Sequence, residues 1–379
     1  MGLSQGDTGE QTMDPILHNE LTRRRGVAWQ EVEARDARAF IVYATDGRGQ
    51  NIRYLTNFSP IYGDALFVMT PRRHGYLLNF DWEIPRARED TGLEEFTASF
   101  DLVGEVGSLL RDLEVTRGRV ATIGFDRIPH PMFMDLAARH PGIEFIDITH
   151  SVERARRIKS AYEIAQLRRA VEITEAGVRA VREALRPGLS EVELAALADY
   201  TMKAAGAGVL AFPTLALSGA ERVVPVRMPT ERRVREGDVV MLDLGATWNG
   251  YQADLSRTFV VGRPSSDQEQ AYQVVLDAWQ RVVDEARPGV PCRRLQEVAA
   301  QVAAKAGYGL AHRIGHGVGL ATSLEWPNLQ SEEEPLAPGM TLCIEPGICL
   351  AGIGTVKVED DLVVTEGGVE LLSVSDRSL

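Results

Sequence analysis

The chain has 379 residues, more than a single hydrophobic core usually organises, so its length predicts two domains. Apolar residues make up 44% and charged residues 25% of the chain, which argues against a disordered, fibrous or membrane-embedded protein. The net charge of -13 argues against nucleic acid as a partner, because binding to phosphate backbones requires clustered Lys and Arg.

The three cysteines, Cys292, Cys343 and Cys349, are too few for a disulfide framework, so we expect a protein of the reducing cytoplasm. The first eleven residues are polar and acidic and lack the apolar segment of a signal peptide. No apolar run approaches the ~18 residues of a membrane-spanning helix. We therefore expect a chain that is neither exported nor attached to a membrane.

The first part of the chain alternates strand and helix patterns. Short apolar runs separated by turn residues predict strands at residues 40–43, 66–69, 76–79 and 120–124, and apolar residues at helical spacing predict a helix over 102–113. We expect a small α/β domain over residues 1–157. A long amphipathic pattern over 152–185, ended by Pro187 and Gly188, marks the join to a second domain over 158–379.

An internal repeat organises the second domain. Pro187 and Pro288 lie in matching Arg-Pro-Gly stretches 101 residues apart, and each stretch precedes a helical pattern that ends in a glycine. The first of these helices opens with Ser190 followed by Glu193, a capping box. After each helix comes an apolar strand that carries an acidic residue, Asp243 in the first copy and Glu345 in the second. Two such halves facing one another would bring the two acidic residues to a shared central cleft.

Two further carboxylates and a histidine extend this acidic set. Asp254 follows Asp243 across a glycine-containing turn, and Glu359 follows Glu345 in the same way, so each pair is expected to lie side by side in a hairpin. His316 lies between glycines that permit close approach of the backbone. Four converging carboxylates repel one another unless cations lie between them.

Two interpretations of this set are open. In one, the carboxylates and the imidazole bind two divalent ions, of a kind such as Mn, Zn, Co or Fe(II), that share a bridging hydroxide. In the other, each carboxylate is separately neutralised by a buried Arg or Lys. The matching positions of the acidic residues in the two repeats favour the metal site.

The same residues carry a resemblance to a known family. The motifs resemble the five-ligand set of the pita-bread metallopeptidases, which include methionine aminopeptidase, aminopeptidase P, prolidase and creatinase; they are Asp243 in LDLGA, Asp254 in ADLSRTF, His316 in GHGVGL, Glu345 in IEPG and Glu359 in VEDDLVVT. Residues 51–58 resemble the creatinase-type domain that precedes the catalytic domain in the last three. The resemblance implies a small N-terminal α/β domain, a pseudo-two-fold catalytic domain, C–N bond hydrolysis and a homodimer.

The accessory histidines of the proline-specific members are mostly absent. Val226 stands at the expected position of the first, and Ser323, or Leu324 if one residue is inserted, stands at that of the next. His312 matches one accessory histidine and is a candidate for acid–base catalysis. The hydroxyl of Ser323 could donate one hydrogen bond to an oxyanion but could not shuttle protons near neutral pH.

Two more residues complete the candidate catalytic set. Lys357 replaces an arginine two positions before Glu359, which keeps the charge but loses the bidentate fork. Glu345 is thought to take the proton from the bridging water in the relatives, in addition to binding metal.

Three functions follow from this pattern. The first is a dinuclear-metal hydrolase that cleaves an amide or peptide C–N bond in a small molecule or short peptide other than a standard Xaa-Pro substrate. The second is a metal-dependent lyase, or another specialised non-peptidase, that stabilises a carbanion or enolate in a small polar metabolite. The third is a binding protein with an inactive site, which the intact ligand set disfavours.

Overall fold

A computed structural model describes residues 13–379 except 47–48, 73, 222 and 322–324. The chain divides into two compact units, and the boundary in the sequence lies between Arg156 and Arg157. Among the described residues, no helix is both long and apolar enough to cross a membrane.

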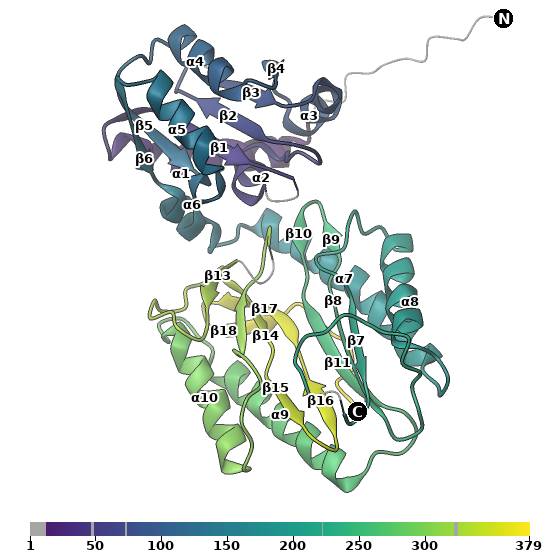
Figure 1. Ribbon diagram of the computed structural model, residues 1–379. Helices are drawn as coiled ribbons and strands as arrows, with labels where there is room; N and C mark the ends of the chain where they lie inside the picture. The colour runs from purple at the N-terminus through teal and green to yellow at the C-terminus, as the bar shows by residue number, and fades with distance from the viewer. Residues whose placement is uncertain (1–12, 47–48, 73, 222, 322–324) are drawn as a thin grey trace, which may run out of the picture. The chain divides into compact units, whose positions relative to one another are not determined.

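The N-terminal unit is built on one mixed sheet (Figure 1). Its six strands lie in the order β4-β3-β2-β1-β5-β6; β1–β2 and β2–β3 are antiparallel, and the other neighbours are parallel. The strands are β1 (Ala37–Ala44), β2 (Ala65–Met69), β3 (His74–Leu78), β4 (Phe96–Ala98), β5 (Gly118–Ile123) and β6 (Ile143–Asp147). The helices are α1 (Pro15–Glu33), α2 (Gln50–Thr56), α3 (Ile84–Thr91), α4 (Leu102–Asp112), α5 (His130–Arg139) and α6 (Thr149–Arg156), with short 3-10 turns η1 (Asp81–Glu83) and η2 (Phe125–Arg127).

The predicted elements of this unit are confirmed. The four apolar runs form β1, β2, β3 and β5, and the pattern over 102–113 forms α4. These four strands are buried along most of their length because helices cover the sheet, so they appear in the sequence as apolar runs rather than as alternating patterns.

The amphipathic pattern over 152–185 is interrupted. It forms the end of α6 and then α7 (Ala161–Ala184), separated by a short non-helical stretch. The second helix begins at Ser160, whose hydroxyl accepts a hydrogen bond from the Glu163 N–H, while the Glu163 carboxylate accepts one from the Ser160 N–H. This capping box starts a new helix after the break, although the apolar spacing in the sequence continues across it.

The C-terminal unit repeats one arrangement of elements twice. The first copy contains α7, α8 (Glu191–Ala204), β7 (Leu215–Ser218), β8 (Val239–Leu244) and β11 (Leu255–Val260), and the second contains α9 (Ser266–Glu285), α10 (Cys292–Lys305), β12 (Gly315–Gly317), β14 (Thr341–Ile344) and β17 (Asp360–Thr365). The capping box predicted at Ser190 and Glu193 opens α8.

Each copy forms its own antiparallel sheet. The first has the order β11-β8-β7, and the second has the order β13-β12-β14-β17-β18, with β13 (Glu325–Asn328) and β18 (Gly368–Leu371) at its edges. Two small hairpins lie beside these sheets: β9 (Thr247–Trp248) with β10 (Tyr251–Gln252), and β15 (Gly347–Leu350) with β16 (Gly354–Lys357).

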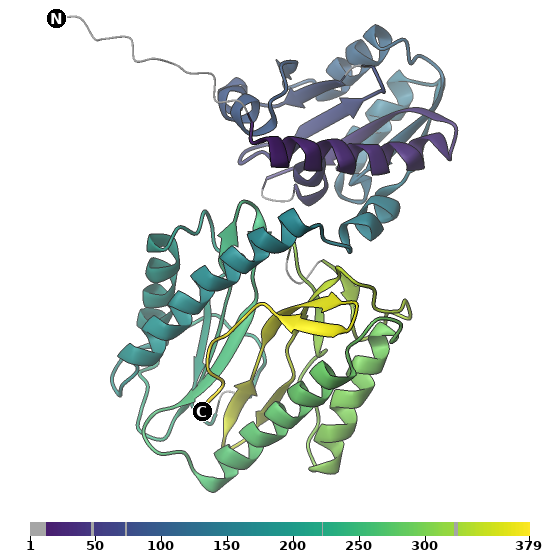
Figure 2. The same cartoon turned by 180° about the vertical axis from the view of Figure 1, so that it is seen from behind.

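Matching helices pack on the two sheets. Helices α7 and α9 lie across the strands in the view of Figure 2, and each packs on the shorter helix that follows it, α8 or α10. The first copy's core contains Val178, Leu194 and Leu242, and the second copy's core contains Val275, Leu295 and Leu342. The repeat in the sequence therefore corresponds to two equivalent packed halves.

Candidate metal centre

The four predicted carboxylates lie at matching positions in the two halves. Strands β8 and β11 are antiparallel, and Asp243 near the end of β8 pairs with Ser256, two residues after Asp254. In the second half β14 pairs with β17, and Glu345 directly follows β14 while Glu359 directly precedes β17. A bridge between Ser256 and Glu359 joins the two halves. The expected convergence of the acidic residues is therefore present in the structure.

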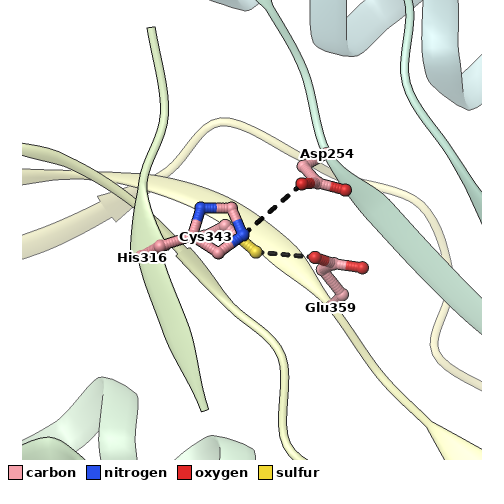
Figure 3. Close-up of side chains that lie close together, drawn as sticks. All are labelled: Asp254, His316, Cys343 and Glu359. Atoms are coloured by element: carbon pink, nitrogen blue, oxygen red, sulfur yellow. Dashed lines mark hydrogen bonds and ion pairs between the residues drawn. The ribbon is translucent and has the colours of Figure 1, made fainter. Parts of the chain in front are cut away.

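His316 enters the same space from β12, which pairs with β14. Its Nε2 lies 3.6 Å from Asp254 Oδ2 (Figure 3). The same Nε2 lies 3.5 Å from Glu345 Oε1. The Nδ1 atom lies 2.9 Å from the Gly317 carbonyl oxygen, so a hydrogen on Nδ1 leaves the Nε2 lone pair facing the carboxylates. Burial lowers the pKa of His316, which favours the neutral imidazole that binds metal.

The glycines beside His316 have the role predicted for them. A Cβ at Gly315 would collide with the Cys343 carbonyl oxygen, and one at Gly317 would collide with the Trp326 carbonyl oxygen. Glycine at both positions lets β12 lie close against its neighbours, which holds the imidazole over the carboxylates.

One further potential ligand, Cys343, was not identified as such from the sequence. The side chains of Asp254, His316, Cys343 and Glu359 are buried, and each offers a ligand atom within 4.8 Å of the others (Figure 3). The Cys343 thiol donates a hydrogen bond to Glu359 Oε1 across 2.7 Å. The signal was its position two residues before Glu345, because alternate residues of a strand share a face.

Lys357 lies among the carboxylates rather than beside one of them. Its Nζ is 2.9 Å from Asp243 Oδ2, 2.8 Å from Glu345 Oε2 and 3.1 Å from Glu359 Oε2. Burial alone would lower the pKa of Lys357, but the surrounding carboxylates raise it well above its usual value, so the side chain is an ammonium ion. The expectation that Lys357 keeps the charge of the family's arginine agrees with this placement.

The site is rich in buried negative charge. Burial, followed by the charges of Glu359 and Asp243, raises the pKa of Asp254 well above its usual range. Burial also raises the pKa of Asp243, although Lys357 acts in the opposite direction. Among the described residues, one ammonium lies within hydrogen-bond distance of three of the four carboxylates and does not contact Asp254. A divalent ion therefore fits the charge and the donor set of this site.

Hydrogen bonds from neighbouring groups hold the carboxylates in place. The Ser256 hydroxyl donates to the Glu359 carboxylate at Oε2. The backbone N–H of Asp254 donates to Asp361 Oδ2 at 3.0 Å, which fixes the backbone that carries the Asp254 carboxylate. Such outer contacts orient carboxylates before a metal binds.

Comparisons with known proteins agree with this geometry. Residues 165–366 match the model of metallopeptidase family M24, and residues 24–158 match that of the Creatinase/Prolidase N-terminal domain. The chain belongs to metallopeptidase family M24. The predicted family, the two-part fold and the enzyme class, a metallohydrolase acting on C–N bonds, are thereby confirmed, and M24 membership implies divalent metal cofactors.

Several M24 relatives are similar over almost their full length. The Xaa-Pro dipeptidase of Pyrococcus furiosus is 33% identical over 332 residues, which cover 87% of this chain and 92% of the relative. The crystal structure of an X-Pro aminopeptidase from Thermotoga maritima has a TM-score of 0.86 at 27% identity and covers 94% of this chain and 98% of that one. The prolidase of Pyrococcus horikoshii has a TM-score of 0.85 at 29% identity, with coverages of 94% and 99%.

The five predicted ligands line a cavity of about 300 Å³ in the C-terminal unit. All five predicted ligands and Lys357 contribute to its wall, and the other lining residues are Phe212, Leu215, Val226, His312 and Arg313. Val226, the residue at the expected place of an accessory histidine, therefore faces the space in which the metal ligands converge.

The structure places one of the remaining candidate catalytic residues at the cavity and does not describe another. His312 lines the cavity, and its Nδ1 lies 2.6 Å from the Arg313 carbonyl oxygen and 3.7 Å from Glu345 Oε2. Ser323 lies outside the described residues, as does Leu324. Arg313 was not singled out in the sequence; its Nε lies 3.9 Å from Glu345 Oε1. Its position three residues before His316 carries no recognisable signal, because only the fold turns it toward the cavity.

Proposed function

We propose that this chain hydrolyses an amide or peptide C–N bond in a small substrate, with divalent metal held by Asp243, Asp254, His316, Glu345 and Glu359. The observation that supports this most strongly is the convergence of these five side chains on one cavity. When bound, a divalent ion lowers the pKa of a coordinated water and polarises a carbonyl oxygen. The sequence predicts two such ions, and the number of carboxylates is sufficient for two.

Acid–base work is assigned to Glu345 and His312. Burial alone would raise the pKa of Glu345, but Lys357 and His316 lower it overall, so its carboxylate is ionised and able to accept a proton. His312 lies 3.7 Å from this carboxylate and at the cavity wall, where a leaving amine would need a proton. We propose that Lys357 acts by positioning carboxylates.

The cavity supports a short substrate with an apolar part. Its volume of about 300 Å³ is at the lower end of ligand pockets, and Phe212, Leu215 and Val226 contribute apolar surface to its lining. Relatives named Xaa-Pro dipeptidase support a dipeptide-sized substrate. Because Val226 places an isopropyl group where an imidazole is expected in proline-specific members, we propose a small amide or short peptide other than Xaa-Pro.

The same Val226 supports one alternative. A metal-dependent lyase acting on a small polar metabolite would need the ligand set but would have no use for the accessory histidines. The two reactions differ in their products, since hydrolysis transfers oxygen from water to the acyl product and elimination does not.

We infer further that the metal is Mn, Zn, Co or Fe, and that the chain works as a homodimer in the cytoplasm. Three free cysteines suit a reducing compartment. Mixed carboxylate and imidazole donors suit these metals.

The test combines metal analysis with a substrate panel. We expect chelator-treated protein to lose turnover of small amides and short peptides and to regain it with Mn²⁺ or Co²⁺. The Asp254→Ala variant should bind little metal and show no turnover, while Asp277→Ala on the exposed face of α9 should behave as wild type. Label from isotopically labelled water should enter the acyl product. A folded wild-type protein that binds no added metal would refute the proposal.

A further inference from the structure

The ammonium of Lys357 lies among three of the five predicted metal ligands. It contacts one oxygen each of Asp243, Glu345 and Glu359, at 2.9, 2.8 and 3.1 Å. An ammonium group has three N–H donors, so these three acceptors satisfy it completely. Its side chain is only 7% exposed, and water therefore has little access as a competing partner.

Asp243 is one of the carboxylates that the ammonium contacts. Its Oδ2 accepts a hydrogen bond from Lys357, and neither Asp243 nor Glu345 is among the residues whose ligand atoms cluster within 4.8 Å. A divalent ion bound by Asp243 and Glu359 would lie close to the ammonium, where two cations repel strongly in a buried site. A second ion can bind there only after Lys357 moves away.

The other side of the site is open to metal. Asp254 and His316 have no ion pair or hydrogen bond with Lys357 among the described residues. The two carboxylate oxygens of Glu345 have different partners. Oε2 contacts the Lys357 ammonium, whereas Oε1 lies 3.5 Å from His316 Nε2. Asp254, His316, Glu345 and Glu359 therefore offer three oxygen donors and one nitrogen donor to a single ion.

The compact shape of lysine suits this arrangement. An ammonium places its donors around one point and can contact three carboxylates at once, whereas a guanidinium is a planar fork that binds one carboxylate in a bidentate manner. The lysine at this position thus combines the two interpretations open from the sequence, because a buried lysine neutralises part of the acidic set while the rest remains available to metal.

We propose that Lys357 takes the place of one of the two metal ions, so that the resting enzyme binds a single divalent ion at Asp254, His316, Glu345 and Glu359. The inference rests on the proposed metal-dependent function. The inference changes the expected number of tightly bound metal ions per chain from two to one and leaves the proposed reaction, hydrolysis of a C–N bond, unchanged.

Metal titration of the full chain tests this. Chelator-treated wild-type protein titrated with Mn²⁺ in a calorimeter should bind about one equivalent tightly, and Lys357→Met, which keeps the length of the side chain but removes the charge, should bind about two. Lys305→Met, at an exposed position in α10, is the matched control and should stay at about one. Thermal melting establishes that the variants are folded.

Electron paramagnetic resonance of the wild type gives a second measurement that needs no variant. A lone Mn²⁺ should show the hyperfine pattern of an isolated ion, whereas two ions about 3.5–4 Å apart should show magnetic coupling. Two equivalents of similar affinity in the wild type, a coupled signal, or an unchanged stoichiometry in folded Lys357→Met would each overturn the inference while leaving a metal-dependent hydrolase. No bound metal in any protein would overturn both.

Discussion

The thiol of Cys343 donates a hydrogen bond to Glu359 Oε1 across 2.7 Å. Cys343 lies on β14, and Glu359 directly precedes β17, the strand that pairs with β14. Glu359 also accepts a hydrogen bond from Ser256. Burial, together with the negative charge of Glu359, raises the pKa of the Cys343 thiol well above its usual value. The neutral thiol thus supports Glu359 through this hydrogen bond.

Substitution of Cys343 tests this role. Cys343→Ser keeps a donor and should change metal affinity by less than about threefold, whereas Cys343→Ala should weaken it about 10- to 100-fold because a support of Glu359 is lost. Cobalt-substituted wild type should show no sulfur-to-cobalt charge-transfer absorption. A strong band of that kind, lost in Cys343→Ser, would instead make Cys343 a ligand.

Restoring a histidine at position 226 should increase activity on proline peptides. Val226 lines the cavity with the metal ligands, so an imidazole there would face the substrate. We expect Val226→His to raise kcat/KM for Xaa-Pro dipeptides on the order of 10²-fold, the usual effect of a positioned acid–base group. Val224→His, at a residue outside the cavity lining, is the control. Efficient Xaa-Pro cleavage by the wild type would contradict the proposed substrate class.

The glycine after His316 should be intolerant of a side chain. Gly317→Ala would place a Cβ against the Trp326 carbonyl oxygen, and the shift of β12 should reduce the free energy of unfolding by about 1–3 kcal/mol. Gly367→Ala, where a Cβ meets nothing within 4 Å, should be close to neutral. Urea denaturation of metal-free protein measures the free energy of unfolding of both variants and of the wild type. Equal stability of the two variants would show that β12 adjusts at no cost.

The N-terminal unit should gain stability from Glu20 only above acidic pH. Glu20 is buried, and its carboxylate accepts hydrogen bonds from Arg23 at 2.6 Å and from the buried Arg24 at 2.9 Å. Burial alone would raise the pKa of Glu20, but these two arginines lower it overall. Because the folded pKa lies below the unfolded value of about 4.3, the stabilisation is present above that pH and is lost as pH falls through the folded pKa.

Glu20→Gln tests this prediction. At pH 7 the substitution should reduce stability by about 1.5–3 kcal/mol, the value typical of hydrogen bonds to a charged group. The difference from wild type should shrink as the pH is lowered below about 4.3. Thermal melting across this pH range measures it, with the exposed Glu89→Gln as control. A difference that does not change with pH would mean that Glu20 acts through packing alone.

Much of this protein was predictable because its signals are local or repeated. The apolar runs of β1, β2, β3 and β5, the capping box of α8 and the two Arg-Pro-Gly stretches depend on neighbouring residues. The repeat placed Asp243 and Glu345 at equivalent positions, and buried acidic residues in strands indicate a cation. The family followed from five motifs in order.

The tertiary structure decided what depends on contacts between distant residues. Lys357 and Asp243 are 114 residues apart, and only the pairing of the two halves brings an ammonium among three carboxylates. In the sequence, Cys343 is indistinguishable from the apolar residues of a buried strand. Only the tertiary structure brings Glu359 within hydrogen-bond distance of its thiol. Local patterns record which residues are buried and in which element, whereas the partner of a buried polar group is set by packing between segments far apart in the chain.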